Sequence, residues 1–223
     1  MSKPTQHSAV HLIPEAGVDA ERWNRLPSPE TVERTARAVE AHGIRVIVAE
    51  NGDGALAAIQ RIVPWGAEVM NGSSTTLAEI GYDDLLASGK SGWRDLHVGI
   101  TAENDDTKRA ELRRKSVTAD YFISSANAIA ETGEIVACDA SGSRVGAWPF
   151  AAGHLVLVIG INKIVPTLDD ALRRVREYAY RLEDTRARKA YGMPSVIGKC
   201  VILAQEKVPD RITLILVRES LGY

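Results

Sequence analysis

Residues 71–81 contain a loop whose small and hydroxyl-bearing side chains are suited to hold an anion. The segment follows an apolar run that ends at Met70 and leads into a helix-like apolar pair, Leu77 and Ile80. A loop between a strand end and a helix start aims unpaired N–H groups outward, and the helix dipole adds partial positive charge there. The alternative is an ordinary helix N-cap with a turn, and the sequence does not decide between the two. The residues that would contact a phosphate or carboxylate are Gly72, Ser73, Ser74, Thr75 and Thr76.

A second polar segment, residues 124–135, places a carboxylate among hydroxyl and amide side chains. Two serines end a predicted strand, a short alanine-rich helical turn follows, and Thr132-Gly133 precedes the next strand. In a cleft, Glu131 would act as a general base or as a nucleophile toward an activated acyl group, with Asn127 and Thr132 beside it. The alternative, which the sequence favours, is a tight turn at Thr132-Gly133 with Glu131 capping neighbouring N–H groups.

Two cations follow later predicted strands. Arg144 comes directly after a predicted hairpin turn, and Asn162-Lys163 follows the most apolar strand, residues 154–159. Ligands in open α/β sheets bind beyond the carboxyl ends of the strands, and arginine offers a planar fork to carboxylate or phosphate. We therefore expect Arg144, Asn162 and Lys163 to lie opposite the hydroxyl loop. Each cation taken singly is equally consistent with an exposed loop.

The elements that must position these residues alternate between strands and helices. Ser28-Pro29 predicts a helix start, with Gly43 closing the segment, and residues 44–48 form a β-branched apolar strand. A turn at residues 51–53 precedes a second helix that ends before Pro64. This alternation favours a mostly parallel sheet with helices on its faces.

The second half of the chain continues the pattern. Residues 105–118 predict a charged helix, and residues 89–95 a loop with an exposed Trp93. Residues 167–189 predict the clearest helix, with one apolar stripe and an arginine-rich opposite face. We interpret that face as solvated, with docking of a partner as the alternative. Further strands are expected at residues 119–123, 135–137, 195–203 and 211–217.

Composition limits the class of protein. The chain has 223 residues, 45% of them hydrophobic and 25% charged, with a net charge of −2. These values predict one ordinary globular domain over residues 1–223 and give no reason to expect a nucleic-acid or membrane partner. The two cysteines, Cys138 and Cys200, make no Cys-x-x-Cys pair, which favours a reducing, cytoplasmic location. Residues 1–20 are expected to be loose, without the pattern of a signal peptide.

The ordered series of motifs resembles the LUD-domain group, the lactate-utilization proteins. Residues 72–81 are similar to its Gly-Gly-Ser-x-Thr-Leu-x-Glu-Ile-Gly signature, which adds Glu79 to the expected binding residues. The later motifs that match are Asn127 to Gly133, Ser143-Arg144-Val145, residues 160–165 and residues 219–223. The resemblance implies a fold like that of sugar-phosphate isomerases and CoA transferases. It also implies a role beside iron–sulfur partners that oxidise L-lactate to pyruvate, a phosphate-holding Ser/Thr loop, and a homodimer.

One departure from the group bears on cofactors. Similar members carry a cysteine-rich stretch near the C-terminus, where this chain keeps only Cys200, so we expect no metal, no cluster and no other cofactor. Three hypotheses remain, and the sequence does not decide whether the protein is an enzyme. The first is an anion site at residues 73–76. The second is an accessory subunit that docks on iron–sulfur proteins through the arginine-rich face. The third is a sugar-phosphate or CoA-directed enzyme that uses Glu131.

Overall fold

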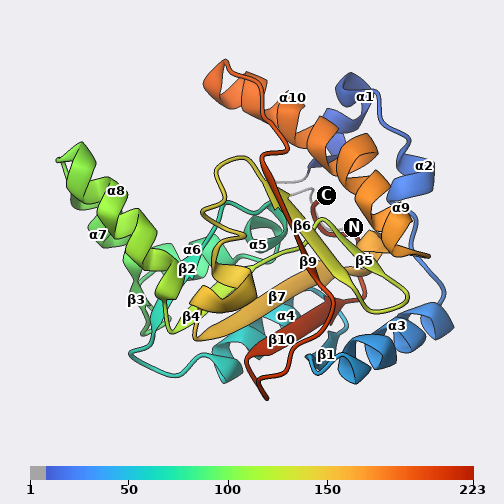
Figure 1. The fold of residues 1–223 in the computed structure, drawn as a ribbon, viewed down its shortest axis with the longest axis horizontal. Coiled ribbons are helices and arrows are strands. Elements are labelled where there is room, and N and C mark those ends of the chain that lie inside the picture. Colours follow the sequence, from blue (N-terminus) through green and yellow to red (C-terminus); the bar gives the residue numbers. More distant parts are fainter. Residues whose placement is uncertain (1–8) are drawn as a thin grey trace.

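A six-stranded parallel sheet forms the centre of the protein, which we describe from a computed structural model of residues 9–223 (Figure 1). Every neighbouring pair of strands in this main sheet runs parallel. The predicted α/β class with a mostly parallel sheet is therefore confirmed. In spatial order the strands are β1 (Arg45–Ala49), β10 (Ile212–Val217), β7 (His154–Gly160), β4 (Tyr121–Ser124), β2 (Glu68–Asn71) and β3 (Arg94–Asp95).

A smaller sheet of four strands packs beside the main sheet. It is mixed, since β5 (Ala128–Ala130) pairs with β8 (Ile164–Val165) in parallel, whereas β6 (Ile135–Asp139) pairs with both β5 and β9 (Lys199–Leu203) in antiparallel fashion. Two expectations are corrected here. Residues 128–130 form a strand and not a helical turn, because Ala128, Ile129 and Ala130 are all buried between β6 and β8. The two C-terminal strands also enter different sheets. The order is β8 (Ile164–Val165), β5 (Ala128–Ala130), β6 (Ile135–Asp139) and β9 (Lys199–Leu203).

Helices complete four layers. One face of the main sheet packs through Val156 and Val158 against α4 (Gly52–Ile62), α5 (Thr75–Glu79) and α6 (Tyr82–Ala87). The other face packs on the smaller sheet through Leu155 and Leu157. The outer face of the smaller sheet is covered by α9 and α10. The helices are α1 (Ile13–Ala16), α2 (Ala20–Trp23), α3 (Pro29–Ala41), α4 (Gly52–Ile62), α5 (Thr75–Glu79), α6 (Tyr82–Ala87), α7 (Leu96–Ala102), α8 (Asp106–Lys115), α9 (Leu168–Arg174) and α10 (Tyr180–Tyr191).

Helix caps follow the sequence closely. Ser28 accepts a hydrogen bond from the Thr31 amide at the start of α3, and Thr167 accepts one from the Asp170 amide at the start of α9. Asn51, expected in a turn, instead caps α4 by accepting from the Gly54 amide. The long predicted helix over residues 167–189 is present, but a π-helical segment, Val175–Ala179, divides it into α9 and α10.

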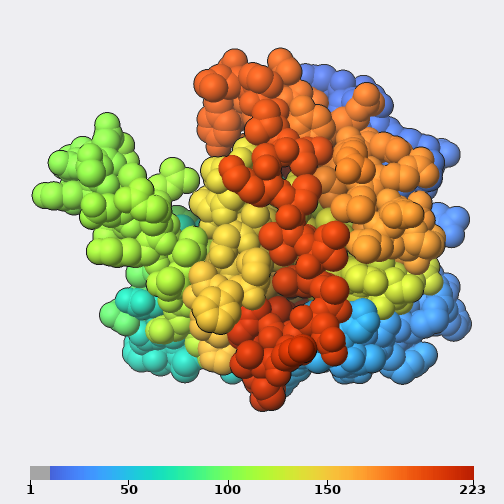
Figure 2. All heavy atoms as spheres, in the orientation of Figure 1, coloured from blue at the N-terminus to red at the C-terminus, as the bar shows by residue number. Residues whose placement is uncertain are grey.

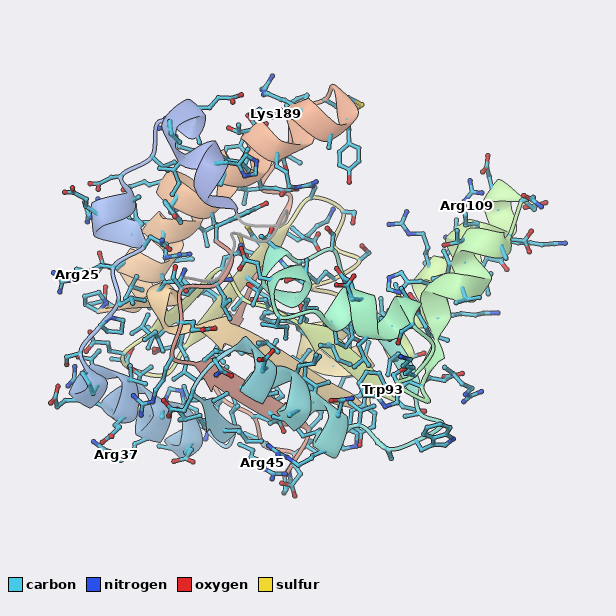
Figure 3. The ribbon with its side chains drawn as sticks, turned by 180° about the vertical axis from the view of Figure 1, so that it is seen from behind. Arg25, Arg37, Arg45, Trp93, Arg109 and Lys189 are labelled. Carbon is cyan, nitrogen blue, oxygen red and sulfur yellow. The ribbon has the colours of Figure 1, made fainter. Side chains whose placement is uncertain are left out.

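An arm formed by α7 and α8 projects away from the layers (Figures 1 and 2). Neither helix contains a buried residue, and Arg109 lies on the outer part of the arm (Figure 3). The charged helix was predicted and α7 was not. Trp93, which lies at the base of the arm, is half-buried and not exposed as expected, because its indole N–H donates to the Val63 carbonyl.

The N-terminal residues differ from the expected loose segment. Over residues 9–20 the chain forms a 3₁₀ turn (Ala9–Leu12), α1 and the start of α2, and Leu12 is buried against the α9–α10 layer. The remainder of the predicted loose segment, residues 1–8, lies outside the described residues. Within residues 9–223, no helix has both the length and the apolar character needed to cross a bilayer.

Candidate functional site

A cavity of about 570 Å³ opens where three neighbouring strands of the main sheet end. The loops after β2, β4 and β7 all contribute to its lining, through residues 72–76, residues 125–127 and Lys163. Because parallel strands present their carboxyl ends at one edge, residues far apart in sequence meet here. Residues 72–76, Arg144 and Lys163 therefore line one cavity, on the side of the sheet where the strand-end rule predicted them to lie.

Lys163 is the most unusual residue of the cavity. Its side chain is 1% exposed, and its amine donates to Thr76 Oγ1 (2.9 Å), Ser125 Oγ (3.1 Å) and the Ala126 carbonyl (3.0 Å). All three acceptors are neutral. Burial holds the pKa of Lys163 well below its usual value, and the nearby charge of Arg174 lowers that pKa further. The amine is therefore disposed to be uncharged, and the hydroxyls of Thr76 and Ser125 can hydrogen-bond it in either state.

Arg144 is held in place by two backbone carbonyls and one carboxylate. Its guanidinium donates to the carbonyls of Ser125 and Cys138, and its backbone amide donates to Asp139 Oδ2 (3.0 Å). Burial lowers the pKa of Arg144, but a guanidinium keeps its proton in proteins. The stem of Arg144 packs on Gly72, where an added Cβ would lie 2.8 Å from Arg144 Cδ. Gly72 therefore gives room to the arginine.

The hydroxyl loop has two separate tasks. Ser74 accepts a hydrogen bond from the Leu77 amide (3.3 Å), so the N-cap interpretation is confirmed for this residue. Thr76 turns inward to Lys163. Ser73 is exposed at the cavity, and Thr75 also lines it. Since α5 has only five residues, its dipole contributes little. The guanidinium-bearing side chain of Arg144, which packs on Gly72, supplies a fixed positive charge beside the loop.

The opposite wall comes from α10 and the last residues of the chain. Glu183 accepts from both Arg186 (2.7 Å) and the Tyr223 hydroxyl (2.6 Å). Glu79 accepts from the Gly222 amide (2.6 Å), and its negative charge raises the pKa of Lys163, opposing the effect of burial. Gly222 packs so closely that an added Cβ would lie 2.3 Å from Thr76 Oγ1. The last residues of the chain therefore cover Thr76 and Lys163.

Three predicted site residues lie elsewhere. Glu131 follows the far end of β5 and forms an ion pair with Arg34 of α3, outside the lining of the cavity. Thr132 hydrogen-bonds Glu134, and Gly133 makes the turn with a φ of 107°. The turn interpretation of this segment agrees with these contacts.

The two predicted asparagines both hold the structure together. Asn127 lines the cavity, and its side-chain oxygen accepts from the Cys138 amide (2.8 Å). Asn162 is buried beside Lys163, donates to Asn24 Oδ1 (2.7 Å) and accepts from the Leu221 amide (3.1 Å). Asn162 therefore anchors the C-terminal residues without reaching the cavity surface.

Arg174 is the main feature that the sequence analysis missed. It was counted with the solvated arginines of the 167–189 helix, but it is completely buried. It donates to the carbonyls of Trp23 (2.9 Å) and Asn127, and burial lowers its pKa to about 10. The available signal was its position one residue before Val175, on the edge of the apolar stripe. Ser125, directly after β4, was likewise left out of the expected set although it follows a strand end.

Metal ligands are not gathered in this part of the chain. Among residues 9–223, no group of three or more His, Cys, Asp or Glu side chains is placed to hold an ion. The site instead combines buried nitrogen donors with hydroxyls, an arrangement suited to binding an anion and moving a proton.

Residues 32–217 match the LUD-domain family. The chain belongs to the LUD-domain family. The LUD domain spans every strand of both sheets and includes the hydroxyl loop, Ser125, Arg144 and Lys163. Tyr223 lies beyond the matched residues.

Similarity to known proteins outside this match is distant. The LUD domain is similar to a crystal structure, at 1.70 Å resolution, of a DUF162 family protein from Deinococcus radiodurans. The TM-score is 0.48 and the identity 12%, over 86% of this chain and 99% of that one. No curated protein shows significant similarity to the chain.

Proposed function

We propose that the cavity binds an anionic small metabolite through Arg144 and the loop of residues 72–76. The observation that carries this proposal is a pair of arginines that lack an ion-pair partner. Arg144 lies at the cavity and Arg174 beneath it, and neither has an ion-pair partner within 4.0 Å among the described residues. Buried cations are normally paired, so a carboxylate or phosphate from a ligand is the natural counter-charge.

The size of the cavity favours more than a three-carbon acid alone. A volume of about 570 Å³ falls in the range of sites for drug-sized ligands and cofactors. A metabolite that places one anionic group against Arg144 leaves room for further atoms toward Tyr180 and Val196, which also line the cavity. Sugar phosphates, nucleotides and the ends of CoA esters therefore belong among the candidate ligands beside lactate and pyruvate.

Lys163 is the group that we assign to proton transfer at the bound metabolite. A general base works best when its pKa lies near the working pH, and burial moves this amine in that direction. Glu131 is not assigned this role, because its carboxylate is paired with Arg34 outside the cavity.

The physiological setting that we propose is the oxidation of L-lactate to pyruvate, which membership of the LUD-domain family suggests. Docking on iron–sulfur proteins and formation of a homodimer belong to the same proposal. The arginine-rich face gives docking little support, because Arg173 pairs with Glu177 and Arg188 with Asp184 on the same helix, while Arg174 is buried.

Calorimetric titration and thermal unfolding with matched ligands test the anion proposal. L-lactate, pyruvate, sugar phosphates, nucleotides and CoA esters are compared, with lactamide and pyruvamide as uncharged counterparts of the two acids. At about a hundred times its dissociation constant, a ligand should raise the Tm by roughly 5 to 10 °C. An amide that binds as tightly as its acid would contradict the proposal.

Variants of Ser73 place the ligand in the cavity without disturbing the fold. Ser73 is exposed, so Ser73→Asp adds a negative charge beside the expected anion and should weaken binding about 10- to 100-fold. Ser73→Asn is the matched neutral control and should bind nearly as well as the wild type. Glu131→Gln is the second control, because its carboxylate lies outside the cavity. Equal ligand affinities for Ser73→Asp and Ser73→Asn would show that the loop does not contact the bound ligand.

A further inference from the structure

The two cysteines face each other across the smaller sheet. Cys138 of β6 and Cys200 of β9 are direct partners in the antiparallel register. The Cys138 amide donates to Asn127 Oδ1 and its carbonyl accepts from Arg144, so neither backbone group points toward β9. The cysteines therefore occupy a non-hydrogen-bonded pair, in which Cα atoms are about 4.5 Å apart and side chains share one face.

That spacing fits a disulfide. A disulfide requires Cα atoms roughly 4.4 to 6.8 Å apart and Cβ atoms about 3.5 to 4.5 Å apart, which a directly opposed pair can satisfy with little movement of the strands. Both cysteines are reduced, Cys200 is exposed, and Cys138 is half-buried at the cavity wall. Burial raises the pKa of Cys138 to about 12, and the proximity of Cys200 contributes to that rise.

We propose that Cys138 and Cys200 form a reversible cross-strand disulfide by exchange with a low-molecular-weight disulfide. The exposed Cys200 thiolate attacks one sulfur of the small disulfide, whose S–S bond breaks and releases one small thiol. The Cys138 thiolate then attacks the Cys200 sulfur of this mixed disulfide and releases the second small thiol. Two electrons pass from the cysteines to the oxidant, and the two cysteine protons end on the released thiols.

The bond would fasten an edge strand to the cavity wall. β9 is the last strand of its sheet, and β6 is its one partner among the described strands. Cys138 contributes the carbonyl that holds the Arg144 guanidinium. The modification therefore lies beside the proposed anion site, but its formation does not depend on what that site binds.

Mass spectrometry of the full chain tests the bond directly. The protein is incubated with excess glutathione disulfide, alkylated and digested without reduction. We expect a linked peptide pair containing both cysteines and lighter by two hydrogens, which dithiothreitol separates again. Closure from the mixed disulfide should accelerate about tenfold per pH unit near neutrality, because the Cys138 thiolate is the scarce species. The oxidised protein should also melt several degrees higher than the reduced one.

Two single variants separate the steps. Cys138→Ser should stop at glutathione attached to Cys200, whereas Cys200→Ser should give neither the adduct at that position nor the link. Wild-type protein that stops at glutathionylated Cys200, or that joins two chains through Cys200, would overturn the proposal. No reaction of the wild type under these conditions would overturn it equally.

Discussion

Replacing Lys163 with methionine should change how stability depends on pH. In the folded protein burial holds the pKa of Lys163 well below 10.5, whereas the unfolded chain titrates near that ordinary value. Between the two pKa values the unfolded chain carries one more proton than the folded chain at this residue. Raising the pH through this window therefore stabilises the wild-type fold, and lowering it destabilises the fold until the penalty is complete below the folded pKa.

The size of the effect follows from a single proton. A difference of one bound proton changes the free energy of unfolding by about 1.4 kcal/mol per pH unit, or roughly 3 to 6 °C in Tm for a domain of this size. Methionine keeps most of the side-chain volume and binds no proton. The variant also loses the hydrogen bonds to Thr76, Ser125 and the Ala126 carbonyl, which gives a constant offset and leaves the slope unchanged.

Urea unfolding followed by circular dichroism, at intervals from about pH 7 to about pH 10, measures this slope. The free energy of the wild type minus that of Lys163→Met should rise by about 1.4 kcal/mol per pH unit within the window. Lys90→Met, which removes an exposed lysine, is the matched control and should run parallel to the wild type. Parallel curves for Lys163→Met as well would refute an uncharged Lys163 in the fold.

Two further predictions concern the cavity. Binding of an anion beside Lys163 should draw a proton onto its amine. Calorimetric binding enthalpies measured in buffers of different ionisation enthalpy should therefore reveal proton uptake, and Lys163→Met should abolish that uptake. Binding enthalpies that do not depend on the buffer would contradict this prediction. Gly72→Ala should lower the free energy of unfolding by about 1 to 3 kcal/mol, because the new methyl group collides with the anchored stem of Arg144. The control Gly99→Ala has open space around its new methyl group and should be neutral or slightly stabilising in thermal unfolding. A wild-type Tm for Gly72→Ala would show that Arg144 is free to shift.

Local chemistry made most of the elements predictable. The apolar run of β7 and the Ser28-Pro29 helix start are decided by residues adjacent in sequence, and the structure places both as expected. The meeting of the hydroxyl loop with Lys163 was also predictable, because it needs only the rule that parallel strands end at one edge. Contacts between distant segments determine the features that were not predicted. Ala128 lies in a strand because β6 and β8 flank it, and Arg174 is buried because Trp23 and Asn127 supply acceptors from distant segments.

Glu131 shows why a carboxylate in a polar segment cannot be placed from sequence. Its position depends on which end of β5 faces the cavity, and the register of β5 against β6 and β8 settles that question. The partner of Glu131, Arg34, lies on a helix almost a hundred residues earlier, with no motif to connect them.

The strand order has a consequence for how the chain folds during synthesis. β1 lies at an edge of the main sheet, and β10 is its one partner among the described strands. Arg45 therefore has no strand neighbour until Thr213 has been synthesised. β10 in turn separates β1 from β7, and until it emerges from the ribosome the apolar edges of both strands lack a partner. Contacts between such distant residues close late and slow the folding of parallel sheets. The nascent chain therefore presents an unpaired apolar edge through most of its translation, which is the period in which chaperones would bind it.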